Sequence, residues 1–315
     1  MVARAKAPEP ATDRSKEGDL SKGAGLIDGK IVPIADAKLP ITDWGFLRSD
    51  VTYDVAHVWK GSFFRLDDHL ARFQASMKGL RLSIPMDSSD IRRELMNLVR
   101  ATGLRDAYVS MICTRGSVKP GMPRHPKNCV NRFYSYVLPF VWVMPEDMQA
   151  RGAHAIMAKT PRIAPESVDP TIKNFHWGDL TRAMFEASDA GADIAFLTDG
   201  HGHLTEGPGF NIFAIIDGTV VSPDRGALEG ITRKSVFELC DEIGVPYQIR
   251  PLHVSELEGA DELLTATTAG GVMPVSRLDG RIYGNDRPGP ISAKLRQRYW
   301  QKHEEGWHAT PIQYD

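Results

Sequence analysis

The chain has 315 residues, which is long enough for two domains that each bury a substantial core. Hydrophobic residues make up 42% of it and charged residues 25%, as in ordinary globular proteins. The formal net charge of −2 at pH 7 leaves no basic surplus, so we expect neither nucleic acid nor an anionic membrane as a partner.

The cysteines and the apolar runs favour a cytoplasmic protein. Cys113, Cys129 and Cys240 are far apart and include no CxxC pair, so neither a disulfide framework nor a zinc site is expected. No apolar run reaches the roughly 18 residues that are needed to span a bilayer. Residues 1–23 lack the apolar core of a signal peptide and are expected to form a disordered tail.

Residues 24–145 carry the signals of a small α+β domain. An Asp-Gly pair at residues 28–29 joins two short strands, because this dipeptide favours a tight hairpin turn. Residues 51–59 alternate at period two, which predicts a longer strand. Strands at 107–114 and 132–143 close this half, so we expect a sheet with helices on one side.

Two helices are expected between these strands. The first is capped by Asp67 or Asp68, and the second by Ser88 or Ser89, since all four can accept hydrogen bonds from a first helical turn. Arg72 falls off the apolar face of the first helix, so spacing alone predicts a solvated arginine. The segment 114–131 is rich in proline, glycine and basic residues, which predicts an exposed loop.

A linker at residues 146–152, next to Pro145, is expected to lead into a larger domain at 153–315. In chain order this half predicts strands at 153–158, 194–198, 203–206, 210–216 and 263–267, hairpin turns at 217–218 and 279–280, and helices that end at Gly191, at Gly244 and at about Trp300.

One lysine in this half has an unusual setting, just ahead of a helix. The turn signal Asp169-Pro170 precedes it, and Lys173 then lies among Ile172, Phe175 and Trp177. A lysine among apolar side chains loses hydration, which disfavours its charged form and makes the free amine a nucleophile. The residues alone leave open a simpler reading, in which Lys173 only lays its stem along these rings.

Five segments in one order give this lysine a context. They are DDHLARF at 67–73, DPTIKNFHWGDLTRAMFEA at 169–187, LTEGPGFNIF at 204–213, GITRK at 230–234 and TTAGG at 267–271. Together they resemble the class IV aminotransferases, pyridoxal-phosphate enzymes of fold type IV. The second and third segments are most similar to the (R)-selective amine transaminases. The resemblance implies an α+β fold with a small N-terminal α/β sandwich and a larger C-terminal, β-barrel-like domain with helices.

The resemblance also implies the cofactor, pyridoxal 5′-phosphate, and makes Lys173 the catalytic residue that holds it as a Schiff base. Glu206, otherwise a strand-end glutamate, then keeps the pyridine nitrogen protonated so that the ring accepts electrons. Arg72 becomes a phosphate ligand, because a guanidinium binds two oxygens at once. The other cofactor-binding residues that it implies are Leu228, against the ring face, with Ile231, Thr232, Thr267 and Thr268.

The helix after Gly230 supports either of two interpretations. A glycine ahead of a helix leaves N–H groups that can bind an anion. Alternatively, Thr232 is an ordinary N-cap of this helix.

Substrate class rests on fewer residues. By resemblance the pocket contains Arg48, Tyr53, Val55, Tyr108, Ser110, Arg124, Trp177, Thr268 and Ala269. Branched-chain enzymes have an arginine at the place of Ser110, and (R)-amine transaminases have phenylalanine and glutamate at the places of Tyr108 and Ser110, so the chain departs from both. Arg48 and Arg124 could bind a substrate carboxylate through paired hydrogen bonds, which leaves D-amino-acid transamination open. Ordinary strand packing would also account for Tyr53 and Val55.

The resemblance implies a transaminase that moves an amino group from an (R)-amine or D-amino acid to a keto acid such as pyruvate. The alternatives are a D-amino-acid or branched-chain aminotransferase, and a lyase of the aminodeoxychorismate lyase type. In the family, the loop that corresponds to 114–131 helps to close the neighbouring subunit's active site, so a homodimer is implied. His201 and His203 flank a turn glycine, and we expect no metal site there.

Overall fold

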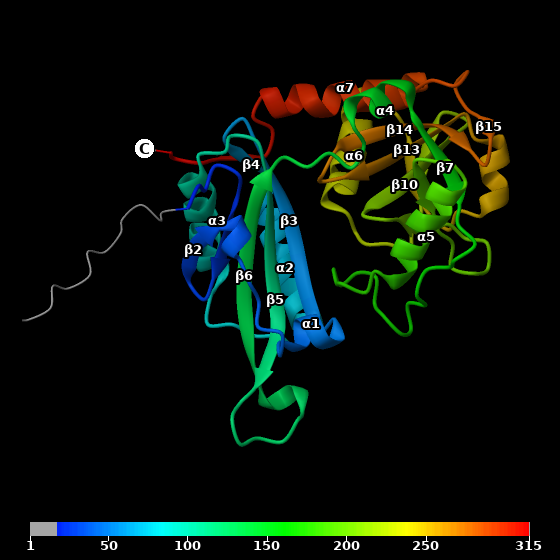
Figure 1. Ribbon diagram of the computed structural model, residues 1–315. Coiled ribbons are helices and arrows are strands. Elements are labelled where there is room, and N and C mark those ends of the chain that lie inside the picture. Colours follow the sequence, from blue (N-terminus) through cyan, green and yellow to red (C-terminus); the bar gives the residue numbers. More distant parts are fainter. Residues whose placement is uncertain (1–17, 315) are drawn as a thin grey trace, which may run out of the picture.

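The computed structural model describes residues 18–314, which form two sheets linked by a long C-terminal helix (Figure 1). The first sheet contains β1 (Ala24–Ile27), β2 (Lys30–Pro33), β3 (Val51–Trp59), β4 (Ser62–Phe64), β5 (Ala107–Val118), β6 (Cys129–Pro139) and β16 (Ala309–Pro311). Their order across the sheet is β16-β4-β3-β5-β6-β1-β2. The predicted hairpin at residues 28–29 is confirmed, with Asp28 and Gly29 at φ 47° and 76°.

The second sheet contains β7 (Ala153–Met157), β8 (Ile194–Phe196), β9 (Glu206–Gly207), β10 (Phe210–Ile216), β11 (Thr219–Ser222), β12 (Tyr247–Ile249), β13 (Glu262–Thr267), β14 (Gly271–Leu278) and β15 (Arg281–Ile282). Its main path runs β12-β11-β10-β13-β14-β7-β8, with β9 beside β10 and β15 beside β14. The helices are α1 (Trp44–Arg48), α2 (Leu66–Gly79), α3 (Ser88–Thr102), α4 (Glu146–Arg151), α5 (Gly178–Asp189), α6 (Ile231–Ile243) and α7 (Pro290–Glu304), with 3₁₀ turns at Ile34–Asp36, Pro126–Asn128 and Val254–Gly259. Among residues 18–314, no helix combines the length and the apolar character that a membrane crossing requires.

β3 is an interior strand of the first sheet, between β4 and β5, and both of its faces are covered. Ala56 and Val58 pack with the apolar faces of α2 and α3, the helices on one side of the sheet. Val51, Tyr53 and Val55 belong to a separate cluster on the other side. This second face is turned toward the larger domain, so the strand that supports the core of one domain also presents side chains to the space between the two.

The caps of α2 and α3 differ from those that the sequence predicted. α2 begins at Leu66, and its N-cap is Arg65 in the left-handed region, at φ 49°. Asp67 and Asp68 therefore lie in the first turn, where carboxylates interact favourably with the helix dipole. α3 is capped by Asp87, whose carboxylate accepts hydrogen bonds from two backbone N–H groups of the first turn.

The expected loop at 114–131 is shorter than predicted, because both of its ends belong to β-strands. β5 and β6 stay paired as far as Val118 and Cys129, with one irregularity after Thr114. Only residues 119–128 form the tip, which projects from the body of the protein (Figure 1). Backbone pairing continues here although the side chains show no alternation, because the ladder depends on main-chain hydrogen bonds.

The domain boundaries need two corrections. Residues 146–152, the expected linker, contain α4, because Pro145 precedes a run of good helix formers and acidic residues occupy the first turn. The last strand, β16, pairs with β4 of the first sheet, so the larger domain does not keep all of residues 153–315. Of the predicted tail, residues 1–17 lie outside the described residues, whereas residues 18–23 include a turn in which the Gly23 N–H donates to the Leu20 carbonyl at 3.0 Å.

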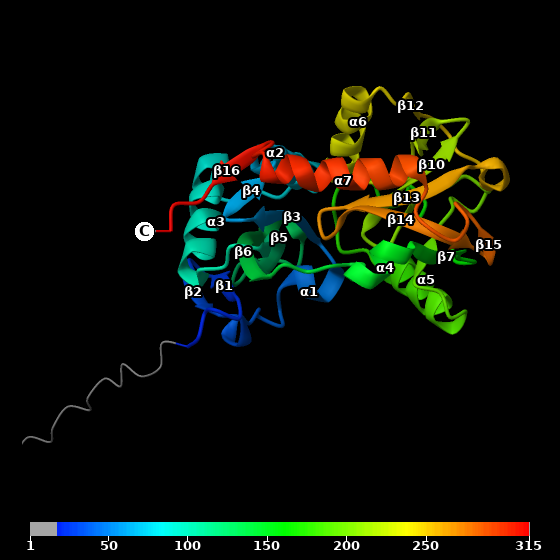
Figure 2. The same ribbon diagram turned by 90° about the horizontal axis from the view of Figure 1, so that it is seen from above.

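α7 covers one face of the second sheet and then reaches the first domain (Figure 2). Near its end the ring of His303 lies in a group of aromatic side chains from both domains: His57, Trp59, Phe64 and Trp300. The Nε2 atoms of His57 and His303 are 3.1 Å apart, and His303 Nδ1 donates to the Tyr299 carbonyl at 2.8 Å. The neutral ring of His303 therefore accepts at Nε2, and His57 is the donor. This aromatic cluster connects the two domains.

Candidate active site

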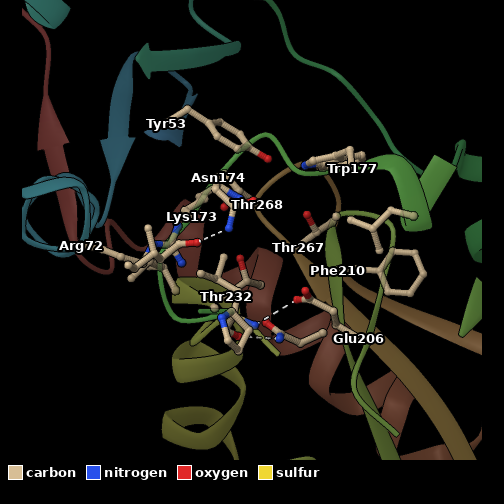
Figure 3. Close-up of a pocket in the computed structure, with 18 of the residues that line it drawn as sticks. Tyr53, Arg72, Lys173, Asn174, Trp177, Glu206, Phe210, Thr232, Thr267 and Thr268 are labelled. Atoms are coloured by element: carbon tan, nitrogen blue, oxygen red, sulfur yellow. Dashed lines mark hydrogen bonds between the residues drawn. The ribbon is translucent and has the colours of Figure 1, made fainter. Parts of the chain in front are cut away.

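An open pocket lies between the Tyr53 face of the first sheet and the larger domain, with about 640 Å³ of space that includes solvent at its mouth (Figure 3). Its walls come from β3 and α2, from the segment 170–177, from the turn after β9, from the start of α6 and from the end of β13. Ten predicted site residues line it: Tyr53, Arg72, Lys173, Trp177, Glu206, Leu228, Ile231, Thr232, Thr267 and Thr268. Segments far apart in the sequence thus converge here.

Lys173 is presented by a segment that docks on β3. Its carbonyl accepts from Thr52 Oγ1 at 2.6 Å and from the Tyr53 N–H at 3.4 Å, and its own N–H donates to Ser76 Oγ at 3.3 Å. The Lys173 Nζ lies 4.5 Å from the centre of the Tyr53 ring, and that ring contacts Phe175. The main chain of Lys173 is therefore fixed to the first domain, while its amine projects into the pocket.

Arg72 is held by a buried carboxylate and is not the solvated arginine that its spacing predicted. Its Nε and Nη2 donate to both oxygens of Asp54, at 2.7 and 2.8 Å, and its Nη1 donates to the Glu229 carbonyl at 3.0 Å. Burial by itself would raise the pKa of Asp54, but Arg72 and the hydrogen bond from His69 hold that pKa well below its usual range. One N–H on each Nη has no partner among residues 18–314, and these two can bind an anion in the pocket.

Glu206 lies on the opposite side of the pocket from Arg72 (Figure 3). It is presented by the tight β9–β10 hairpin and is 8% exposed. Its Oε1 accepts from Arg162 Nε and Nη2, at 3.1 and 2.8 Å, and its Oε2 accepts from the Leu228 N–H at 3.0 Å. Each carboxylate oxygen is thereby oriented, and Oε2 has a second lone pair that no group among residues 18–314 uses.

The N-terminus of α6 opens into the pocket without a side-chain cap. Gly230 is the N-cap, so the prediction of Thr232 as cap is wrong, and Thr232 lies in the first turn instead. A Cβ at Gly230 would come within 2.0 Å of Asn211 Oδ1, which explains the glycine by lack of space. The uncapped N–H groups carry the positive end of the helix dipole and suit an anion.

The turn after β13 places two hydroxyl groups in the pocket. Thr267 and Thr268 line it, and Gly270 and Gly271 then turn the chain back at φ 156° and 70°. Ala269, expected in the substrate pocket, is 6% exposed and does not line it. Its carbonyl accepts from the Val143 N–H at 2.8 Å, so this turn is tied to the connection between the domains.

Five other predicted pocket residues lie outside the cavity. Arg48 stacks on Trp44, with its Cζ 3.6 Å from the ring centre, and Arg124 is exposed on the 119–128 tip. Val55 and Ser110 are buried partners on adjacent strands, and Tyr108 stacks on Tyr136. Burial raises the pKa of the Tyr108 hydroxyl. Within one chain, Val55, Tyr108 and Ser110 are therefore part of the first sheet, and neither arginine reaches the pocket.

Asp54 and Arg162 belong to the site although no sequence motif indicates them. Asp54 had a usable signal, since a lone carboxylate in an otherwise mostly apolar strand requires a partner when the strand is buried. Arg162 had none, because it lies in a loop, and only the folded chain brings it to Glu206.

The two sides of the pocket carry opposite charges. One side offers a guanidinium, uncapped helix N–H groups and threonine hydroxyls, which suit a phosphate. The other side offers a carboxylate, which suits a protonated ring nitrogen. A lysine amine lies in the same cavity. The residues therefore fit a phosphorylated pyridine aldehyde, while among residues 18–314 no three His, Cys, Asp or Glu side chains are grouped to hold a metal.

Comparison with known proteins agrees with this geometry. Residues 52–278 match the family described as amino-transferase class IV. The chain belongs to this family. It is 32% identical over 276 residues to the "Putative branched-chain-amino-acid aminotransferase" of Methanocaldococcus jannaschii, a match that covers 87% of this chain and 94% of that protein. It is 27% identical over 273 residues to the D-alanine aminotransferase of Bacillus licheniformis, with 86% and 94% covered.

Solved structures extend the match to the whole fold. A branched-chain amino acid aminotransferase crystallised with pyridoxamine 5′-phosphate superposes with a TM-score of 0.85 at 27% identity, over 93% of this chain and 99% of that one. The branched-chain aminotransferase of Thermoproteus uzoniensis superposes with a TM-score of 0.83 at 25% identity, over 92% and 99%. The expected α+β architecture of fold type IV is thereby confirmed.

Proposed function

We propose that this class IV aminotransferase takes the amino group from an (R)-amine or a D-amino acid and passes it to a keto acid such as pyruvate. As a member of its family the chain uses pyridoxal 5′-phosphate. When bound, this cofactor supplies an electron sink for the substrate carbon that loses a proton.

Each pocket residue has one task in this proposal. Arg72, the N–H groups of Ile231 and Thr232, and the hydroxyls of Thr267 and Thr268 would bind the phosphate. Leu228 would contact the ring. Glu206 would accept the hydrogen bond of the protonated ring nitrogen and so stabilise its positive charge.

Lys173 moves the proton at the reacting carbon, first as base and then as acid. Its backbone is fixed by Thr52 and Ser76, so only the side chain has to move. The Tyr53 ring excludes water from one side of the amine.

The pairing of the pocket cations supports the (R)-amine rather than the D-amino acid as donor. Among the described residues, the lysines and arginines that line the pocket are Arg72, Arg162 and Lys173. Arg72 is assigned to the cofactor's phosphate, and Arg162 is paired with Glu206 and Asp179, so neither is left for a substrate carboxylate. The remaining walls include the rings of Tyr53 and Trp177, which suit an amine with an apolar group.

A branched-chain amino acid is the second candidate donor. The names of the similar proteins favour it, and a substrate carboxylate could be bound by N–H groups of the turn at 267–271 rather than by an arginine.

A spectral half-reaction separates these donors. Protein loaded with pyridoxal 5′-phosphate is mixed, without keto acid, with (R)-1-phenylethylamine, (S)-1-phenylethylamine, D-alanine or L-leucine, and loss of the visible absorbance is followed. We expect conversion by the (R)-amine or D-alanine and none by the (S)-amine. Conversion by L-leucine alone would overturn the proposal in favour of the second candidate. Lys173→Ala is the control: with every donor, its bound cofactor should lose visible absorbance much more slowly than that of the wild type.

We further propose a homodimer in which the tip at 119–128, with Arg124, reaches the neighbouring pocket. Ile41, Phe46 and Leu47 are 77%, 69% and 52% exposed, and burial of such side chains is the usual reason for association. Sedimentation at several concentrations tests this, and a monomer at all of them would exclude it.

A further inference from the structure

Glu206 is one of two carboxylates that share a single guanidinium. Arg162 donates through Nε and Nη2 to Glu206 and through Nη1 to Asp179. All three are largely buried, with side-chain exposures of 11% for Arg162, 11% for Glu206 and 7% for Asp179. Burial alone would lower the pKa of Arg162, but the two anions raise it, so the guanidinium stays charged.

The charges in this group decide what Glu206 can offer. Two carboxylates and one guanidinium sum to one net negative charge, which a protonated ring nitrogen would neutralise. Without Asp179, Arg162 and Glu206 would form a neutral pair, and the gain from protonating the ring would be smaller. A strong electron sink at this site therefore requires both carboxylates.

Asp179 is also fixed in position. Its Oδ1 accepts from the Leu180 N–H and its Oδ2 from the Ile163 N–H, both at 2.8 Å, and it stands in the first turn of α5. The Arg162 N–H donates to the Thr198 carbonyl at 2.8 Å. The Arg162 guanidinium is thus held between Asp179 and Glu206. Main-chain hydrogen bonds fix both Asp179 and the backbone of Arg162, and this sets the orientation of the guanidinium toward Glu206 Oε1.

We propose that Asp179, acting through Arg162, is a positioning residue that orients Glu206 and leaves it with the net negative charge needed to keep the cofactor's ring nitrogen protonated. This inference rests on the proposed function, since it needs a pyridine ring beside Glu206. Asp179 touches neither substrate nor cofactor in this role.

The test compares Asp179→Asn with Asp189→Asn, the same change at an exposed position of the same helix. Both holoenzymes are measured for melting temperature, cofactor affinity, absorbance maximum of the bound cofactor, and kcat and KM for the best donor. We expect D179N to shift the absorbance maximum and to lower kcat at least about tenfold, the effect of one pK unit, with donor KM changed less than about twofold. D189N should match the wild type.

A double variant shows whether the effect passes through Glu206. In a Glu206→Gln background, D179N should lower kcat by less than about twofold, because the carboxylate it supports is gone. An equal loss in both backgrounds, or a D179N enzyme identical to D189N, would overturn the inference while leaving the proposed function intact. If D179N does not fold, Arg162→Lys replaces it in the same comparison, since lysine keeps the charge but lacks the planar fork. If the wild type binds no pyridoxal 5′-phosphate, both proposals fail.

Discussion

Asp54→Asn should remove the support of the phosphate-binding arginine without changing the shape of the strand. Asp54 is fully buried, and its two oxygens receive Arg72, the His69 ring and the Val55 N–H. An asparagine keeps one acceptor oxygen but turns an N–H₂ group toward an arginine donor. Breaking one side of a buried ion pair costs about 3–5 kcal/mol, and we expect the lower figure because Arg72 borders the pocket and can rehydrate.

Urea unfolding of the apoenzyme measures this loss, and its pH dependence tests the cause. The folded pKa of Asp54 lies below its unfolded value of about 3.9, so the carboxylate stabilises the protein above about pH 4 and loses that effect as the pH falls further. The difference between wild type and D54N should therefore be constant from about pH 5 to 8 and shrink below about pH 4.

The control is Asp67→Asn, which removes an exposed carboxylate from the first turn of α2. Exposed ion pairs contribute little, so D67N should unfold nearly as the wild type does. D54N should also bind pyridoxal 5′-phosphate more weakly, because Arg72 loses its fixed orientation. Equal unfolding free energies for D54N and D67N would refute the argument.

Two further substitutions probe the α6 N-terminus and the junction between the domains. Gly230→Ala should weaken cofactor binding by roughly tenfold, because the added Cβ collides with the side-chain amide of Asn211. Gly259→Ala is the control, since a Cβ there meets open space and cofactor binding should stay normal. Equal cofactor affinities of the two variants in fluorescence titrations would contradict this reasoning. His303→Gln should reduce the loss of stability between pH 6.5 and about 4. Burial lowers the pKa of His303 to about 4 and that of His57 well below its ordinary value, so the unfolded chain binds more protons in this range. Urea unfolding at several pH values measures this slope, and an unchanged slope would exclude His303 as its source.

The fold was predictable where side-chain periodicity and backbone agree. β3 has the bounds that period two predicts, and Gly244 ends α6 in the left-handed region as expected. The prediction was wrong where tertiary context decides: at the caps of α2 and α3, along the β5–β6 hairpin, and at α4. None of these leaves a strong pattern in the sequence, because main-chain pairing and packing determine them.

The site likewise contains residues that sequence motifs predict and residues that only the fold identifies. The ordered motifs predict Lys173, Glu206 and Arg72 as site residues, and the fold brings them into one cavity. The residues that pair with Arg72 and Glu206 are Asp54, on β3, and Arg162, in a loop. Such pairs depend on contact in the folded protein. The sequence therefore indicates that a buried carboxylate needs a partner, but not which arginine provides it.

The pairing of β16 with β4 has a mechanical consequence. The chain passes from the first sheet to the second between β6 and β7, and it returns between α7 and β16. Two bodies joined by two chain segments cannot separate freely, and the hydrogen bonds of the Lys173 carbonyl to Thr52 and Tyr53 add a third contact between them. Shortening the chain before residue 309 would remove one of the two chain connections and leave the cavity freer to open.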